Sequence, residues 1–160
     1  MNYLQDPNIA YFTQLIIAAA CGMLLGIERV LAGRTAGPRT YSLVAIGSCL
    51  LTIISQNAAY HYPGLAILKV DPVPIVSNII SGIGFLGAGI IIFQNSKLSG
   101  VTTAAGVWVA AAIGITVGFH YYLLALFTTF LTLFIFTIVR TMERQLKKWY
   151  AIIEGEEQLE

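Results

Sequence analysis

The strongest constraint in this sequence is a run of one hundred residues that is almost free of charge. Between Thr40 and Val139 the only charged side chains are Lys69, Asp71 and Lys97. An average soluble domain has about 25% charged residues to cover its surface, whereas this 160-residue chain has 11% and is 57% hydrophobic. The pattern predicts a chain solvated by lipid, and it excludes a disordered chain, a coiled coil and an ordinary soluble enzyme.

Four charge-free stretches are long enough for the roughly 20 apolar residues that one membrane-spanning helix needs. The longest, residues 98–139, would be about 63 Å long as one helix, twice the roughly 30 Å of the hydrocarbon layer. It therefore predicts two helices joined by a turn at residues 118–122, where a glycine meets aromatic residues. Residues 40–68 also exceed one span, and their polar second half predicts that this helix ends near Tyr60.

These stretches predict an all-α membrane protein with five transmembrane helices, because a helix satisfies all its backbone hydrogen bonds within lipid. The expected helices cover about residues 9–29, 40–60, 73–94, 99–118 and 121–143. We expect one transmembrane domain over residues 1–143 and a cytoplasmic juxtamembrane tail over residues 144–160.

Arginine and lysine predict the orientation of these helices. With five spans, eight of the nine basic residues fall on one side of the membrane, and Lys69 falls on the other. The positive-inside rule assigns the larger group to the cytoplasm, so we expect the N-terminus outside and the C-terminus inside. No basic residue precedes Arg29, and the first helix is therefore expected to be a retained span rather than a cleaved signal peptide.

Glycines are concentrated in the third expected helix. Residues 82–87 read G-I-G-F-L-G, which matches a dinucleotide-binding fingerprint, but that fingerprint needs a preceding strand and a βαβ unit. Two interpretations stay open: the small residues let neighbouring helices approach closely, or they break the helix at a functional discontinuity. The glycines that we assign to helix packing are Gly22, Gly26, Gly82, Gly84, Gly87, Gly89 and Gly100.

The densest polar chemistry lies where the first expected helix ends and its loop begins. Glu28 is at the end of a span, where a carboxylate is costly unless it is paired. Arg29, Arg34 and Arg39 recur every five residues, and Thr40 follows them. Three roles stay open: arginines that contact anionic headgroups and fix the topology, an ion pair of Glu28 with an arginine that locks the loop, or a small anion or phosphate site.

Asp71 is the first candidate for a metal ligand. It precedes the third expected helix, where an aspartate is a good N-cap, and Asn78 lies about two turns deeper and could add an amide oxygen. Two oxygens are few for a Mg²⁺ site, although Mg²⁺ keeps several of its waters. His61 and His120 fall on the same expected side and are interpreted as interfacial side chains, with a shared metal site as the alternative.

The start of the fourth expected helix adds further candidates. The hydroxyls of Ser99, Thr102 and Thr103 are expected to cap this helix or to bond back to its carbonyls, and Trp108 lies further along. The sequence shows no nucleophile–base pair, paired carboxylates or phosphate-binding loop. We therefore do not expect an enzyme.

Three motifs occur in a fixed order along the chain. The first loop reads G-I-E-R and then G-R-T-A-G-P-R-T, the third helix reads S-G-I-G-F-L-G-A-G, and the fourth opens with G-V-T-T-A-A-G-V-W. Together they closely resemble the MgtC/SapB family of bacterial inner-membrane proteins, from about Gln14 to Arg140. The chain departs from the family pattern at Pro74, Phe93 and Ser99, where arginine is common.

The resemblance implies a five-helix domain in a bacterial inner membrane, with family links to magnesium limitation, stress adaptation and virulence. Many members carry a soluble C-terminal ACT-like domain, which we do not expect here. Beyond the lipid bilayer, the expected partners are a second copy of the chain and a membrane ATPase or transporter. The net charge of +1 suggests no nucleic-acid partner.

Two functional hypotheses follow. The first is a non-enzymatic regulatory protein in magnesium or ion homeostasis that contacts other membrane complexes. The alternative is a transporter or channel for a divalent cation, with Mg²⁺ as the candidate ion, or for a small solute.

Overall fold

The computed structural model describes residues 7–61, 73–94, 97–143, 145–146 and 149. Within these residues the chain forms five α-helices and one β-hairpin, and the last helix continues as a π-helical segment. In chain order the elements are α1 (Pro7–Leu31), α2 (Pro38–His61), α4 (Val73–Ile90), β1 (Ile92–Gln94), β2 (Lys97–Ser99), α5 (Val101–Gly118), α6 (Tyr122–Phe134) and η2 (Ile135–Val139).

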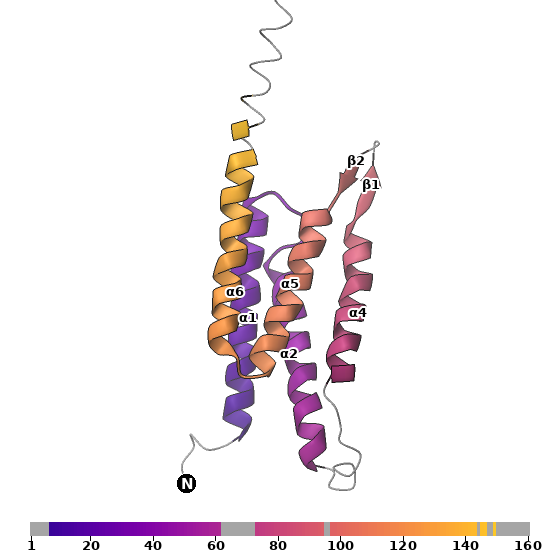
Figure 1. Ribbon diagram of the computed structural model, residues 1–160, viewed down its shortest axis with the longest axis vertical. Helices are drawn as coiled ribbons and strands as arrows, with labels where there is room; N and C mark the ends of the chain where they lie inside the picture. The colour runs from indigo at the N-terminus through magenta and orange to yellow at the C-terminus, as the bar shows by residue number, and fades with distance from the viewer. Residues whose placement is uncertain (1–6, 62–72, 95–96, 144, 147–148, 150–160) are drawn as a thin grey trace, which may run out of the picture.

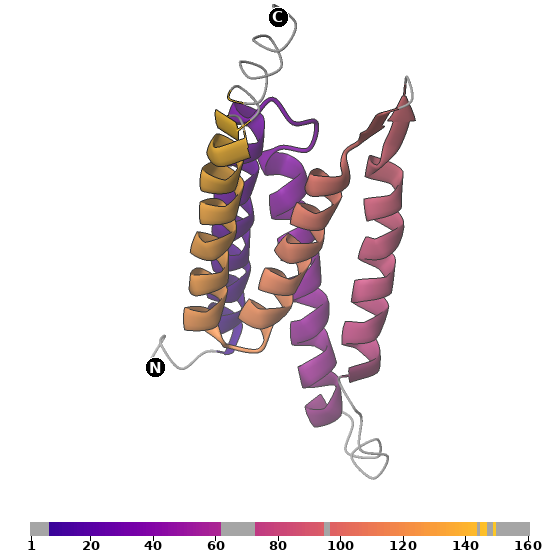
Figure 2. The same ribbon diagram turned by 45° about the horizontal axis from the view of Figure 1, so that its top comes forward.

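Helix α5 is the centre of the bundle. It contacts α1, α2, α4 and α6, and Figures 1 and 2 show α4 beside it at the edge of the molecule. Two glycines allow the close approach of α2: a Cβ on Gly114 would overlap the backbone of Ala45, and one on Gly118 would lie 2.7 Å from Cβ of Thr52. The backbones of α5 and α2 therefore pack closely over several turns.

The helices have the composition of a membrane bundle. Four of them are long and apolar enough to cross a membrane: Asn8–Leu31, Pro38–Asn57, Val101–Gly118 and Tyr122–Glu143. Helix α4 is equally apolar but shorter, over Pro74–Ile90. Large apolar side chains face outward, and those of Leu123 and Phe85 are 83% and 81% exposed. Such surfaces are stable against lipid rather than water, so the chain is a multi-pass membrane protein.

Within the described residues, the predicted helices agree with the observed ones in number and place, apart from the region around residue 95. The turn expected at residues 118–122 is confirmed, since α5 ends at Gly118 and α6 begins at Tyr122. Its reversal uses His120, whose φ of 65° lies in the left-handed region.

The predicted helix over residues 73–94 is wrong at its C-terminal end. Helix α4 ends at Ile90, and the chain forms an antiparallel hairpin in which Ile92 pairs with Ser99. The branched and aromatic residues 91–93 favour an extended strand over a helix. Ser99 therefore lies in β2 and does not cap α5, which begins at Val101 after Gly100, with no side-chain cap. Gly100 has a φ of 90° and lies against the carbonyl of Ile90, where a Cβ would overlap it.

The glycine-rich helix α4 is continuous, so the interpretation of a broken helix is wrong. Most glycines of α4 make no close contact with another helix of the described chain. A Cβ on Gly82, Gly84 or Gly89 would meet nothing within 4 Å, and one on Gly87 would meet only Cβ of Ala104, at 3.7 Å. This helix packs on α5 through its larger residues, and the glycines mostly face outward.

The glycines of α1 lie at close contacts with α2. A Cβ on Gly22 would lie 2.6 Å from the carbonyl oxygen of Tyr41, and one on Gly26 would overlap the backbone of Pro38. These two glycines let α2 begin directly against α1. Ser42 then donates a hydrogen bond to the carbonyl of Ala19 across the same contact, at 3.1 Å.

Matched alanine substitutions test this difference between the helices. Gly22→Ala should lower the free energy of unfolding by about 1–3 kcal/mol, because the new methyl group meets backbone that cannot move aside. Gly84→Ala should leave stability unchanged or raise it, because the methyl group enters open space and alanine is the better helix former. The midpoint of thermal unfolding in detergent measures both effects, and equal losses in the two variants would contradict the packing described here.

Candidate functional site

A buried arginine organises one end of the bundle. The side chain of Arg29, near the end of α1, is 2% exposed. Its Nε and Nη2 atoms donate to the carboxylate of the neighbouring Glu28, and its guanidinium carbon lies 3.5 Å from the ring centroid of Phe136. A buried charge is tolerated only when it is paired and hydrogen-bonded, so Glu28 and Phe136 together hold this arginine in place.

A second arginine connects this end to the loop after α1. Arg140, which follows η2, donates a hydrogen bond from Nη2 to the carbonyl oxygen of Ala32 at 3.0 Å. Its Nη1 lies 3.9 Å from the other carboxylate oxygen of Glu28. Of the three roles left open for this segment, the structure shows the ion pair of Glu28 with an arginine. The partner is Arg29, and Arg140 extends the pair into a cluster that joins α1, its loop and the end of α6.

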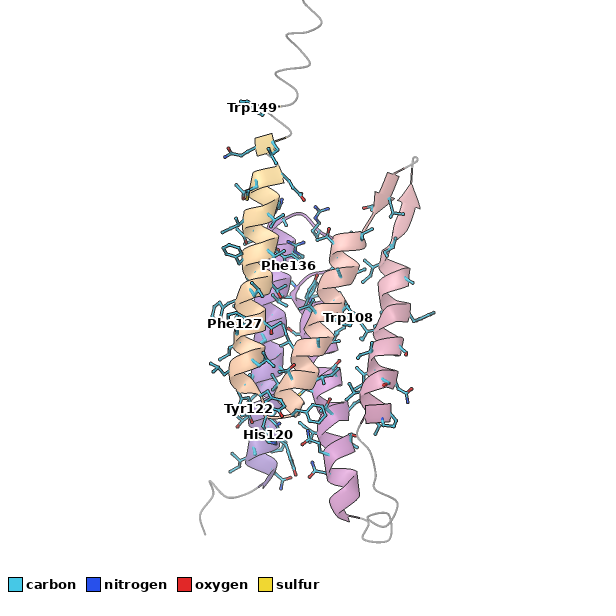
Figure 3. The ribbon with its side chains drawn as sticks, in the orientation of Figure 1. Trp108, His120, Tyr122, Phe127, Phe136 and Trp149 are labelled. Atoms are coloured by element: carbon cyan, nitrogen blue, oxygen red, sulfur yellow. The ribbon has the colours of Figure 1, made fainter. Side chains whose placement is uncertain are left out.

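The π-helical segment η2 forms one wall of this cluster. It spans Ile135–Val139 and carries Phe136, which Figure 3 shows on the side of α6 that faces α5. π-helical segments are rare and are frequent at functional sites. The segment places the ring of Phe136 under Arg29 and brings Arg140 to Ala32.

Helix α5 makes room for the cluster with a glycine. A Cβ on Gly106 would lie 2.7 Å from Cζ of Phe136 and would overlap the hydroxyl of Tyr41. Tyr41 is fully buried, and its hydroxyl donates to the carbonyl oxygen of Thr103 at 3.3 Å. Tyr41 of α2 and Phe136 of η2 thus both meet α5 at Gly106.

A cavity of about 290 Å³ opens beside the cluster, between α5 and the end of α6. Its walls are apolar except for six side chains: Arg29, Arg34, Thr102, Thr132, Arg140 and Glu143. Three of these six, Arg29, Arg34 and Thr102, belong to the set of candidates proposed from the sequence. The first loop and the start of α5 therefore meet in one place.

The other predicted site residues lie apart from this cavity. Arg39 and Thr40 are exposed at the start of α2, and the side chain of Trp108 is 46% exposed on α5. Thr103 is buried, and its backbone carbonyl receives the hydrogen bond of Tyr41. The structure does not bring Arg39, Thr40 or Trp108 into the cluster.

Asn78 belongs to a different feature, an apolar groove of about 710 Å³ between α2 and α4. Gly47, Ser48 and Gly82 line the same groove. A methyl group on Gly47 would meet nothing within 4 Å, as on Gly82. The groove is therefore open beside these two glycines.

The metal prediction centred on Asp71 cannot be placed, because Asp71 lies outside the described residues. Among the residues that the structure describes, no three His, Cys, Asp or Glu side chains gather as metal ligands do. His120 lies at the α5–α6 turn, where its Nδ1 is 3.0 Å from the hydroxyl of Tyr122 (Figure 3). The fully buried Gln14 has its Nε2 3.4 Å from the same Nδ1 and donates to the carbonyl of Val117 at 2.9 Å.

The sequence interpretation missed Phe136, Arg140, Tyr41 and Gly106 as parts of the site. Arg140 did carry a signal, as the first charge after a long uncharged stretch, and Phe136 stands four residues before it. Gly106 lies within the quoted G-V-T-T-A-A-G-V-W motif. Tyr41 carried no signal that separates it from the other aromatic residues of the spans.

Comparison with known proteins identifies the family. The chain matches the MgtC family over residues 15–145. It belongs to the MgtC family. Protein SapB of Bacillus subtilis strain 168 is 42% identical to it over 123 residues, which are 76% of this chain and 52% of SapB. These values confirm the resemblance seen in the motifs.

Two other relatives of this MgtC-family chain have similar coverage. The Escherichia coli K12 protein named "Putative magnesium transporter YhiD" is 38% identical over 129 residues, which are 80% of this chain and 60% of YhiD. Protein MgtC of Salmonella typhimurium LT2 is 34% identical over 146 residues, 91% of this chain and 59% of that protein. The chain thus spans between about half and three fifths of these relatives. No solved structure matches it.

The ion pair can be tested by comparing single and double substitutions. Glu28→Gln should lower the free energy of unfolding by about 3 kcal/mol, because it leaves Arg29 buried without a counter-charge. Adding Arg29→Met should recover most of this loss, since no buried charge then remains. The control is Glu143→Gln, which changes an exposed carboxylate and should have little effect. A double variant less stable than Glu28→Gln in thermal unfolding would contradict this account.

Proposed function

We propose that this MgtC-family chain is a non-enzymatic protein of a bacterial inner membrane that regulates magnesium homeostasis by binding another membrane protein. The family assignment and the magnesium function in the name of YhiD support the link to magnesium. The observation that carries the regulatory role is the open groove between α2 and α4, where Gly47, Ser48 and Gly82 lie among larger apolar residues.

The chemistry of this groove suits a transmembrane helix of a partner protein. Helices associate in lipid where small residues let their backbones approach closely. Gly47 and Gly82 leave that space unused within the described chain, and Ser48 and Asn78 add polar groups that can bond across the interface. An apolar helix lying between α2 and α4 would cover most of the length of the groove.

The sidedness of the protein is part of the proposal. The cluster of Glu28, Arg29 and Arg140 would lie at the cytoplasmic end of the bundle, as the distribution of basic residues predicts. The groove then crosses the hydrocarbon layer. A partner helix in the groove would contact α2 and α4. The end of the bundle that carries the arginine cluster would remain accessible from the cytoplasm.

The alternative is transport of Mg²⁺, which the name of YhiD and the oxygen atoms of Asn78 and Ser48 at the groove favour. Mg²⁺ prefers oxygen ligands and retains part of its water shell. In that case Asp71, just before α4, would supply the carboxylate at the outer mouth of the path.

Substitutions on α4 distinguish a helix-binding groove from the rest of its surface. Gly82→Leu should abolish the growth advantage that the chain gives a bacterial host in magnesium-limited medium, because leucine fills the groove. Gly84→Leu is the matched control, since Gly84 has equally open space but does not line the groove. It should keep full activity, and equal loss in both variants would contradict the proposed groove.

A flux assay separates the two functions. Purified protein in liposomes that hold a Mg²⁺-sensitive dye should give no Mg²⁺-dependent signal above empty liposomes if the protein is a regulator. A photo-cross-linker at Leu51 in the groove should then join the chain to one membrane protein in cells. Flux that Asp71→Asn or Gly82→Leu abolishes would overturn the regulatory proposal and establish transport. A cross-link only to a second copy of the chain would show that the groove forms a homodimer rather than binding a different protein.

A further inference from the structure

The cavity beside the arginine cluster has the composition of an anion site. Three arginines and one glutamate line it, and the paired Glu28 neutralises one of the arginines. Arg34 differs from the other two: it is exposed at the cavity, and no ion pair or side-chain hydrogen bond holds it within the described part of the chain. Its planar guanidinium keeps all its donors available, and this geometry suits the oxygens of a phosphate group.

The first turn of α5 adds a second source of positive potential. Thr102 lines the cavity from this turn, and no side chain caps the helix start at Gly100. The backbone N–H groups at a helix N-terminus carry partial positive charge and commonly bind phosphate or sulfate. The hydroxyl of Thr102 is available there as a further donor.

The apolar residues that line the rest of the cavity indicate which kind of molecule could carry the phosphate. Ala105, Val109, Ile135 and Val139 line the cavity from α5 and the end of α6, and both segments belong to the membrane-spanning helices. The cavity is therefore polar at the level of the loop and apolar toward the middle of the span. Basic pockets between helices on the cytoplasmic side are known places for lipid headgroups.

We infer that this cavity binds a phosphate group through Arg34, Arg140 and the start of α5, either on an anionic lipid headgroup or as a free phosphate ion. Arg29 is not a direct ligand in this account. It positions the site, because its stacking on Phe136 and its pairing with Glu28 fix the wall from which Arg140 projects. The inference does not depend on the groove between α2 and α4.

Binding is measured on the purified full chain with two probes. Native mass spectrometry compares retention of phosphatidylglycerol with retention of zwitterionic phosphatidylcholine. The shift in thermal unfolding midpoint with inorganic phosphate, at constant ionic strength, tests the free ion. The inference requires selective binding of one probe. Phosphatidylglycerol then indicates the lipid headgroup, and inorganic phosphate indicates the soluble ion. Selectivity for neither probe would overturn the inference.

Three variants show whether the binding uses this cavity. Arg34→Gln should weaken binding about tenfold, the size expected for loss of one charge-assisted hydrogen bond. Ala105→Leu should weaken it similarly by filling the cavity without changing the charge. Arg39→Gln removes an exposed arginine that does not line the cavity, and it should leave binding unchanged.

Two results with these variants would overturn the inference. Equal weakening by Arg34→Gln and Arg39→Gln would mean that the surface charge alone attracts the anion, which would overturn the inference. Wild-type binding in Ala105→Leu would overturn it as well, because the cavity would then be irrelevant. Circular dichroism and size-exclusion chromatography confirm that each variant is folded, and the Ala105 variant decides the matter if Arg34→Gln fails to fold.

Discussion

The buried charge of Arg29 is the interaction on which this end of the molecule depends. A guanidinium that is removed from water needs a counter-charge and a favourable surface, and Glu28 and the ring of Phe136 supply them. Because Phe136 comes from η2 and Glu28 from α1, satisfying one charge joins segments that are far apart in sequence. Gly106 on α5 gives the ring its space, and Arg140 extends the cluster to the loop at Ala32.

The helices in the rest of the bundle are held together by a different interaction. In lipid, apolar burial does not favour helix association, so close packing of small residues takes its place. Gly22, Gly114 and Gly118 bring α1, α2 and α5 together in this way. Helix α4 carries glycines as well, but no other part of the described chain packs against Gly82 or Gly84. The proposed partner helix would use the groove that Gly82 lines, and the proposed phosphate site would use the arginine end.

The sequence predicted the helices because charge and length limit what can cross a membrane, and it predicted the α5–α6 turn from one glycine and its aromatic neighbours. It also gave an ion pair of Glu28 as one of three open roles, since a carboxylate at that depth requires a partner. It could not predict that Phe136 and Arg140 complete the cluster, because that contact joins residues more than one hundred positions apart. It missed the hairpin at residues 92–99 because apolar composition alone does not separate a short strand from the end of a helix.

The most direct test of this account measures whether the arginine cluster holds the loop after α1 to the end of α6. Spin labels on the exposed residues Thr35 and Met142 report that distance by pulsed electron resonance, after the buried Cys21 and Cys49 are replaced by alanine. The account predicts one narrow distance distribution, which broadens when Arg140→Gln removes the bonds to Ala32 and Glu28. An equally narrow distribution in that variant would contradict the central role of the cluster.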